Sequence, residues 1–162
     1  MRCLILCVIL VAARFCIAGA QTQPASPHDH DLSHRGDQGM GFMQDKTTHH
    51  FILSKDGGSI QVTANSAQDS ASIDEIRMHL RHIERAFRSG DFNIPMFVHD
   101  QTPPGVPAMT RLKDQIRYRY EPLKDGGRVR ISSGNADAVS AVHEFLRFQI
   151  TDHKTGDALE VK

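Results

Sequence analysis

The sequence predicts an α+β fold, a two-layer sandwich in which a duplicated ββα unit forms a four-stranded antiparallel sheet with two long helices on one face. Three observations support this prediction. The tetrapeptide Lys-Asp-Gly-Gly occurs at residues 55–58 and again at 124–127, each time between short runs of alternating apolar residues. Each copy is followed by a helical pattern that ends in Gly-Asp, at 90–91 and 156–157. The dipeptide Leu-Arg lies inside both patterns, at 80–81 and 146–147. We therefore expect a first repeat over 47–91, a crossover over 92–115 and a second repeat over 116–157.

Each repeat is expected to begin with a β-hairpin. Asp-Gly-Gly between alternating segments is typical of a hairpin turn, because glycine adopts the positive φ that tight turns require. The alternating apolar positions assign one face of each strand to the core. These positions are Phe51, Leu53, Ile60 and Val62 in the first repeat, and Ile116, Tyr118, Tyr120, Val129 and Ile131 in the second.

Each hairpin is followed by a predicted amphipathic helix. In the first helix, Ser72 and Glu75 form a capping-box pattern, apolar residues then recur at spacings of three and four, and Gly90 ends the helix. The second helix is expected from residue 136, with Asn135 as its N-cap, to residue 154. Between the repeats we expect a proline-rich connection to residue 107, followed by a short helix that ends near residue 114.

The first 20 residues have the features of a secretory signal peptide. They combine a short charged start, an apolar stretch over 3–13 and an Ala-x-Ala cleavage motif. The apolar stretch is shorter than the roughly 20 residues that a membrane-spanning helix needs. We expect cleavage near Ala20-Gln21, a periplasmic or secreted location, and no membrane insertion of the mature chain. Residues 21–45 are rich in His, Pro and Gln and predict a flexible tail, which leaves 46–162 as a single α+β domain.

Cleavage at this point removes every cysteine, because Cys3, Cys7 and Cys16 all lie in the leader. We therefore expect no disulfide, haem or iron–sulfur cluster, and a metal ion would need His, Met or carboxylate ligands. The leader contains two of the 19 Lys+Arg residues and none of the 19 Asp+Glu residues, so the mature net charge is 17 − 19 = −2. A near-neutral domain is not typical of nucleic-acid binding. A homodimer is compatible with this composition, and no feature identifies another partner.

The first candidate metal site is on the first helix. At 100° per residue, Glu75, His79 and His82 cluster on one flank, beside the apolar stripe. Two imidazoles and a carboxylate suit Cu²⁺ or Zn²⁺. The equivalent positions of the second helix are all apolar: Ala141, Phe145 and Phe148. The alternative is that both histidines are half-exposed and Glu75 serves only to cap the helix.

The second candidate metal site is in the predicted tail. Its residues are His28, His30, His34, Met40 and Met43. Histidine-rich segments bind divalent metal ions, and a Met-x-x-Met pair offers thioether sulfurs that suit Cu(I). In an exported chain without thiols, this combination favours copper over zinc. The alternative is a solvated tail in which the two methionines and Phe42 pack onto the domain.

A third candidate site is the outward face of the predicted sheet. Strand alternation places Arg117, Arg119, Arg128 and Arg130 there, together with His50. Neighbouring guanidinium groups repel one another, so an anionic ligand, a partner's carboxylates or an acidic tail would stabilise this face. The alternative is a solvated surface with scattered counter-ions such as Glu121.

Structural roles are expected for the other histidines. Alternation points His49 inward, opposite to His50, and predicts a packed and hydrogen-bonded ring. His153 lies near a helix C-terminus, where the helix dipole favours a protonated imidazole. A histidine precedes a carboxylate at 99–100 and at 143–144, but acid–base catalysis also needs a nucleophile or pocket, and no catalytic motif occurs.

Two segments resemble a known family. Met-Gly-Phe at 40–42 followed by Lys-Thr-Thr-His-His-Phe at 46–51, and Val-His-Glu-Phe-Leu-Arg-Phe-Gln-Ile at 142–150, look like segments of a family of small exported bacterial proteins with no assigned activity. The resemblance covers most of 40–157. It implies export and a single domain, and it supplies no catalytic residues.

The sequence therefore favours a non-enzymatic exported or periplasmic protein that binds a transition metal, copper ahead of zinc. The second hypothesis is a binding module that uses the arginine-rich sheet face for an anionic ligand or partner. A small periplasmic enzyme of unknown reaction is the third.

Overall fold

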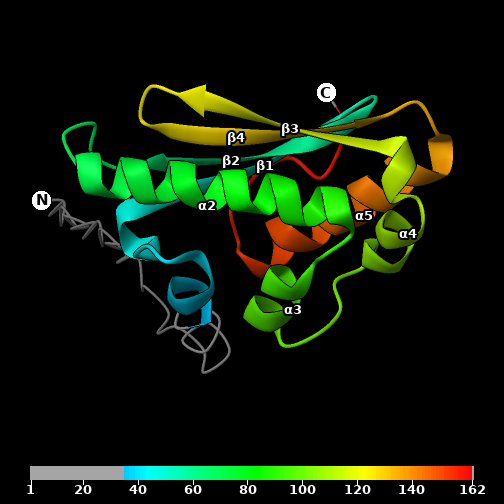
Figure 1. The fold of residues 1–162 in the computed structure, drawn as a ribbon, viewed down its shortest axis with the longest axis horizontal. Helices are drawn as coiled ribbons and strands as arrows, with labels where there is room; N and C mark the ends of the chain where they lie inside the picture. Colours follow the sequence, from blue (N-terminus) through cyan, green and yellow to red (C-terminus); the bar gives the residue numbers. More distant parts are fainter. Residues whose placement is uncertain (1–34, 162) are drawn as a thin grey trace, which may run out of the picture.

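The computed structural model describes residues 35–161, and these residues form an α+β fold (Figure 1). Residues 35–40 are helical. The elements that follow are η1 (Gln44–Lys46), β1 (Thr47–Ser54), β2 (Gly57–Ala64), α2 (Ser70–Ser89), α3 (Asn93–His99), α4 (Val106–Arg111), η2 (Lys113–Gln115), β3 (Ile116–Leu123), β4 (Gly126–Ser133) and α5 (Ala136–Asp152).

The four strands form one antiparallel sheet in the order β1-β2-β4-β3. β1 pairs with β2 and β3 pairs with β4 across two-residue turns, and the second strand of each hairpin meets its counterpart at the centre. There Ile60 pairs with Val129, which occupies the same place in the second hairpin. The two hairpins therefore lie antiparallel on either side of this pair.

The glycines after each turn are needed for close packing of the two hairpins. A Cβ atom on Gly57 would lie 2.4 Å from the carbonyl oxygen of Ile131, and one on Gly126 would lie 2.1 Å from the carbonyl oxygen of Val62. Of these two glycines only Gly57 has a positive φ, at 140°. The sequence predicted glycine for turn geometry, whereas the stronger requirement is the approach of the neighbouring strand.

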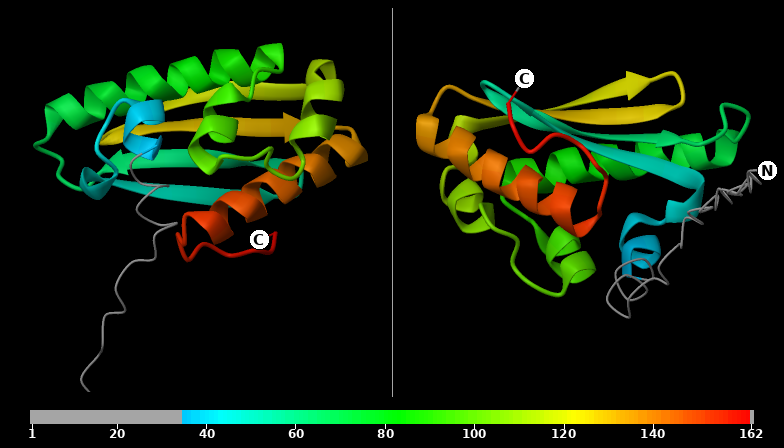
Figure 2. Two further views of the ribbon diagram at one scale, coloured as in Figure 1. Left: turned by 90° about the horizontal axis from the view of Figure 1, so that it is seen from below. Right: turned by 180° about the vertical axis from the view of Figure 1, so that it is seen from behind.

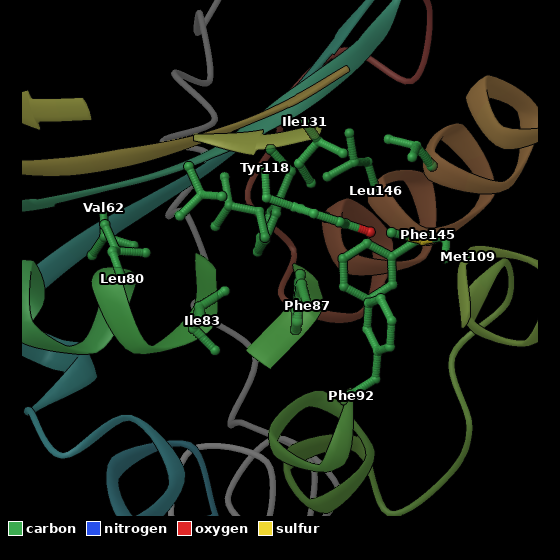
Figure 3. Close-up of a cluster of buried hydrophobic side chains, with 14 of the residues drawn as sticks. Val62, Leu80, Ile83, Phe87, Phe92, Met109, Tyr118, Ile131, Phe145 and Leu146 are labelled. Atoms are coloured by element: carbon green, nitrogen blue, oxygen red, sulfur yellow. The ribbon is translucent and has the colours of Figure 1, made fainter. Parts of the chain in front are cut away.

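Both long helices cover the same face of the sheet, as predicted, and α3 and α4 lie between them on the side away from the sheet (Figure 2). The core fills the space between sheet and helices (Figure 3). Its aromatic centre includes Phe87, whose ring centroid lies 4.3 Å from that of Phe92, 5.8 Å from that of Phe145 and 5.9 Å from that of Tyr118. Burial of these large rings, together with the aliphatic residues around them, stabilises the fold.

Two of the four predicted ends of the long helices agree with the structure. Gly90 is the left-handed C-cap of α2, and α5 begins at Ala136 with the Asn135 side chain accepting from two backbone N–H groups. The predicted capping box was wrong: α2 begins at Ser70, and its N-cap is Asp69, whose carboxylate accepts from the Ser72 N–H at 3.1 Å. A carboxylate is a stronger acceptor than a hydroxyl and suits the positive helix N-terminus, so the helix starts earlier. The second helix also ends two residues before the predicted residue 154.

Side chains from neighbouring segments contact part of each edge of the sheet. On the β3 edge, Arg77 donates to the carbonyls of Leu123, Lys124 and Gly126, and Arg88 donates to the carbonyl of Tyr118. On the β1 edge, the Phe51 N–H donates to the Asp157 carboxylate at 2.9 Å. Exposed strand edges template further pairing, and these contacts occupy part of both edges.

The predicted tail is partly a packed segment. Residues 35–40 form helix, η1 follows, and Phe42 is 3% exposed within the core. The burial of Phe42 ties this segment to the domain, so the domain begins before residue 46. Residues 21–34, which carry the rest of the predicted tail, lie outside the described residues, as does the predicted signal peptide. Within residues 35–161, the helices are too short or too polar to cross a bilayer.

Candidate functional site

Four separate elements bring histidines to one cavity beneath the sheet. Strand alternation points His49 of β1 inward, and His79 flanks the buried stripe of α2. His99 is the last residue of α3 and is 3% exposed, and His153 is the C-cap of α5. All four side chains line a cavity of about 60 Å³. We call this the histidine cavity.

The four imidazole rings and the Phe42 ring contact one another in a row. The Phe42 ring lies 5.5 Å from His79, edge-on, and 5.9 Å from His49, stacked. His49 stacks on His153 at 6.0 Å with an angle of 3° between the rings, and His153 contacts His99 edge-on at 5.0 Å. The segment before β1 therefore completes one side of the cavity.

Two polar groups at the cavity are buried without a partner. Within residues 35–161, neither the Nε2 atom of His49 nor the side-chain nitrogen of Gln149 has a hydrogen bond. His49 is packed as predicted, but its Nε2 atom makes no hydrogen bond within residues 35–161, whereas a hydrogen-bonded ring was predicted. A buried polar group without a partner costs about 1–3 kcal/mol, so Nε2 of His49 would gain from a partner in the cavity.

The cavity keeps three of its histidines neutral. Burial lowers the pKa of His49 to about 4, with smaller contributions from His79 and His50. Burial also lowers the pKa of His79 to about 4, with a contribution from His82. Burial lowers the pKa of His153 to about 3. The neighbouring His99 and His49 also lower this pKa, and Asp152 opposes the shift. The prediction that helix position favours a protonated His153 was wrong, because desolvation outweighs the helix dipole.

His99 joins a polar chain at the far end of the cavity. Its Nδ1 lies 2.6 Å from the Asp152 carboxylate, and its Nε2 lies 3.0 Å from the side-chain oxygen of Gln149. A neutral imidazole with Nδ1–H donating to Asp152 has a lone pair at Nε2. Turning the Gln149 amide by 180° lets its NH₂ group donate to that lone pair and leaves its carbonyl oxygen facing the cavity.

The structure brings only some of the predicted metal ligands together. On α2, His79 turns into the histidine cavity, while Glu75 and His82 are exposed. Met40 lines the same cavity, whereas Met43 is 49% exposed. His28, His30 and His34 lie outside the described residues. Within the part of the chain that the structure describes, no three His, Cys, Asp or Glu side chains stand in an arrangement that holds a metal ion.

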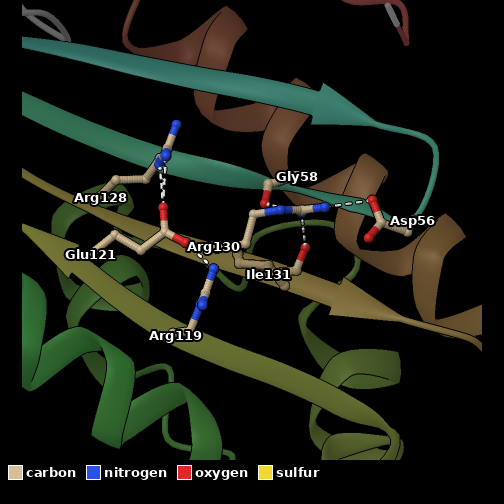
Figure 4. Close-up of polar contacts among 7 residues, drawn as sticks. All are labelled: Asp56, Gly58, Arg119, Glu121, Arg128, Arg130 and Ile131. Carbon is tan, nitrogen blue, oxygen red and sulfur yellow. Dashed lines mark hydrogen bonds and ion pairs between the residues drawn. The ribbon is translucent and has the colours of Figure 1, made fainter.

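The predicted arginine face is largely neutralised by its own acidic neighbours (Figure 4). Glu121 bridges Arg119 and Arg128, and hydrogen bonds from Arg128 are the first cause that lowers its pKa below the usual range. Arg130 reaches Asp56 and also donates to the carbonyls of Gly58 and Ile131, at 2.8 and 2.6 Å. Arg117 is exposed, and no hydrogen bond or ion pair engages it within residues 35–161.

Two further histidines have structural partners. His50 faces outward as predicted, and its Nδ1 lies 2.9 Å from Asp157 of the C-terminal segment. His143 contacts the carbonyl of Ser54 through Nε2 at 2.9 Å.

The contacts of His99 with Gln149 and Asp152 were not predicted from the sequence. The sequence suggested Asp100 as the partner of His99, because the two residues are adjacent. The one sequence feature that could have indicated the observed contacts is the three-residue spacing of Gln149 and Asp152 at the end of a predicted helix.

No family model, curated protein or solved structure matches this chain. The resemblance to small exported bacterial proteins therefore stays a prediction, and the site rests on its own geometry.

Proposed function

We propose that this exported protein binds a transition-metal ion, copper ahead of zinc, in the histidine cavity. One observation carries the proposal: three neutral imidazoles and a thioether side chain surround a single small cavity. They are His49, His79, His153 and Met40. This set replaces the helix and tail sets that the sequence suggested, and it keeps His79 and Met40 from them.

The size of the cavity favours an ion over an organic molecule. Sites for organic ligands usually have volumes of about 300–1,000 Å³, whereas the histidine cavity has about 60 Å³. That volume accommodates an ion or a few waters. Binding an ion would also give the buried Nε2 atom of His49 a partner.

The chemistry of the lining favours copper. Imidazole must be neutral to donate its lone pair to a metal, and burial keeps His49, His79 and His153 in that form. Imidazole with thioether suits Cu(I), and imidazole alone also suits Cu²⁺ and Zn²⁺. Because the side chains do not stand in a ligating arrangement, binding includes rotation of His79 and His153 toward His49. Phe42 contacts two of these rings and must shift with them.

The test is a metal titration of the mature, metal-free protein. His28, His30 and His34 are first replaced by alanine to remove competing sites. The protein is then titrated with Cu(I) against a chromogenic chelator and separately with Cu²⁺ and Zn²⁺. We expect one ion per chain. His49→Phe keeps the ring stack, removes the nitrogen ligand and should abolish binding.

A matched control separates the histidine cavity from the predicted site on α2. His82→Gln removes an exposed histidine of the same helix and should leave the affinity unchanged. If His82→Gln abolishes binding and His49→Phe does not, the helix site is correct and the cavity site is wrong. No binding at micromolar metal by the parent protein would overturn the metal function itself.

A further inference from the structure

The structure holds a second, larger concave site at the β3 edge of the sheet, lined by none of the residues of the histidine cavity and independent of the proposed metal function. A hollow of about 850 Å³ curves around the start of the edge strand β3. Its walls come from the β1–β2 turn, the C-terminal end of α2, η2, and the neighbouring ends of β3 and β4. This volume falls in the range of small-molecule sites. We call it the basic hollow.

The basic hollow has an excess of positive charge. Five cationic side chains line it, namely Arg88, Lys113, Arg117, Arg119 and Arg130, against two acidic ones, Asp56 and Asp114. The lining residues alone carry 5 − 2 = +3, and two acids just outside the lining, Glu84 and Glu121, pair with Arg88 and Arg119. The two acids of the lining are already engaged, Asp56 by Arg130 and Asp114 by Lys113 at 3.9 Å.

One cation in the hollow is available for a ligand. Arg117 is exposed, lines the hollow and makes no ion pair or hydrogen bond within residues 35–161. Two residues along the same face, Arg119 stands directly opposite Arg130 in the β3–β4 register. Repulsion between these two like charges is already offset, because Arg119 pairs with Glu121 and Arg130 pairs with Asp56, so Arg117 is the cation left for an anion.

The backbone fold does not require positive charge at the positions of Arg117, Arg119 and Arg130. In the first half of the molecule, the positions equivalent to Arg117, Arg119 and Arg130 are Thr48, His50 and Gln61. The same backbone is thus built there with uncharged or weakly basic side chains. The matching edge, at β1, is covered by the C-terminal segment through Asp157. The positive charge is confined to the half whose hollow stays open.

We propose that the basic hollow binds a small phosphate-bearing molecule with two or more negative charges, with Arg117 as its main contact. A guanidinium group presents paired N–H donors that match two phosphate oxygens. Arg119 and Arg88 line the same hollow, and Ser132 adds a neutral hydrogen-bonding hydroxyl group.

The probe is inorganic pyrophosphate, added to metal-free full-length protein because pyrophosphate chelates metal ions. We expect one pyrophosphate per chain by calorimetry and a Tm that rises with its concentration. Arg117→Ser should weaken binding at least tenfold and abolish the rise in Tm. Arg117→Lys keeps the charge without the paired donors and should be intermediate.

Arg85→Ser is the matched control, since it removes the same charge from an exposed position of α2 outside the hollow. It should bind as the parent does. Equal binding by the parent and Arg117→Ser would overturn the proposal, and so would an equal rise in Tm with sodium chloride at the same ionic strength. Citrate that binds as tightly as pyrophosphate would refute the assignment to phosphate.

Discussion

Acidification should unfold this protein in a pH range set by three histidines that line the histidine cavity. Burial lowers the pKa of His49 and His79 to about 4 and that of His153 to about 3, whereas an imidazole in the unfolded chain has a pKa of about 6.5. Below pH 6.5 the unfolded state therefore binds more protons than the folded state. The free energy of unfolding is highest above about pH 6.5 and falls as the pH drops from there toward 4.

The expected loss is large. At pH 5 an unfolded imidazole is almost fully protonated, while a folded imidazole with a pKa of about 4 is roughly one-tenth protonated. This difference amounts to on the order of 2 kcal/mol for each histidine, or about 6 kcal/mol for the three if they act independently. A domain of this size typically has a total stability of about 5–15 kcal/mol. The protein should thus be close to unfolding at pH 5.

Urea denaturation at pH 7.5, 6.5, 5.5 and 5.0 measures this loss. Asp56 and Glu121, whose pKa values are lowered by hydrogen bonds from Arg130 and Arg128, affect stability only at lower pH, below about 4.5. Changes in the free energy of unfolding between pH 6.5 and pH 5 therefore reflect the protonation of histidines. The slope of the free energy of unfolding against pH in this range should correspond to the uptake of nearly three protons on unfolding.

His79→Phe provides the internal test. It fills the site with an apolar ring and should reduce the slope by about one proton. His82→Gln should not change the slope, because that side chain is exposed on α2. If the parent has the same urea midpoint at pH 7.5 and 5.0, or if His79→Phe leaves the slope unchanged, the reasoning about the neutral histidines of the cavity fails.

Two substitutions test the packing of the fold. Arg77→Ala removes three hydrogen bonds to carbonyls at the β3–β4 turn and should lower the free energy of unfolding by about 1–3 kcal/mol in urea. Arg85→Ala, on the same helix but exposed, should cost less than about 0.5 kcal/mol, and equal losses would contradict the role given to Arg77. Gly105→Ala should cost about 1–3 kcal/mol or more, since Gly105 has φ of 82° and a Cβ there would lie 2.1 Å from the carbonyl oxygen of Ala141. Gly134→Ala, with no atom within 4 Å, is its control, and a similar Tm for both variants would refute the argument.

The crossover shows where sequence patterns were insufficient. Residues 92–107 were predicted to be a proline-rich connection, yet α3 spans Asn93–His99 with Pro95 in its first turn, where a missing N–H is tolerated. Seven residues are too few for a reliable helical periodicity. The short helix expected from Pro107 is present as α4, which starts at Val106 and ends at Arg111. The missed α3 mattered for function, because it carries His99 into the histidine cavity.

The arginine face shows a different limit. Alternation correctly placed the arginines outward, since the direction of a side chain in a strand depends only on its parity. The acidic residues that pair with these arginines could not all be predicted from alternation. Glu121 reaches both Arg119 and Arg128 because β3 and β4 are adjacent, and Arg130 meets Asp56 because β2 lies beside β4. Which arginine remains unpaired follows from strand order and register.

Features that depend on neighbours along the chain could be predicted from the sequence: two hairpins, two long helices, and the apolar faces that pack them into two layers. Turn glycines, caps and periodicity act over a few residues, so they can be recognised locally. Which polar side chains meet depends on how these elements pack against one another. His49, His79, His99 and His153 come from four separate elements, and their shared cavity exists because the helices, the first strand and the segment before it close over one another. Desolvation in that cavity sets their charge, and desolvation is a property of the assembled core.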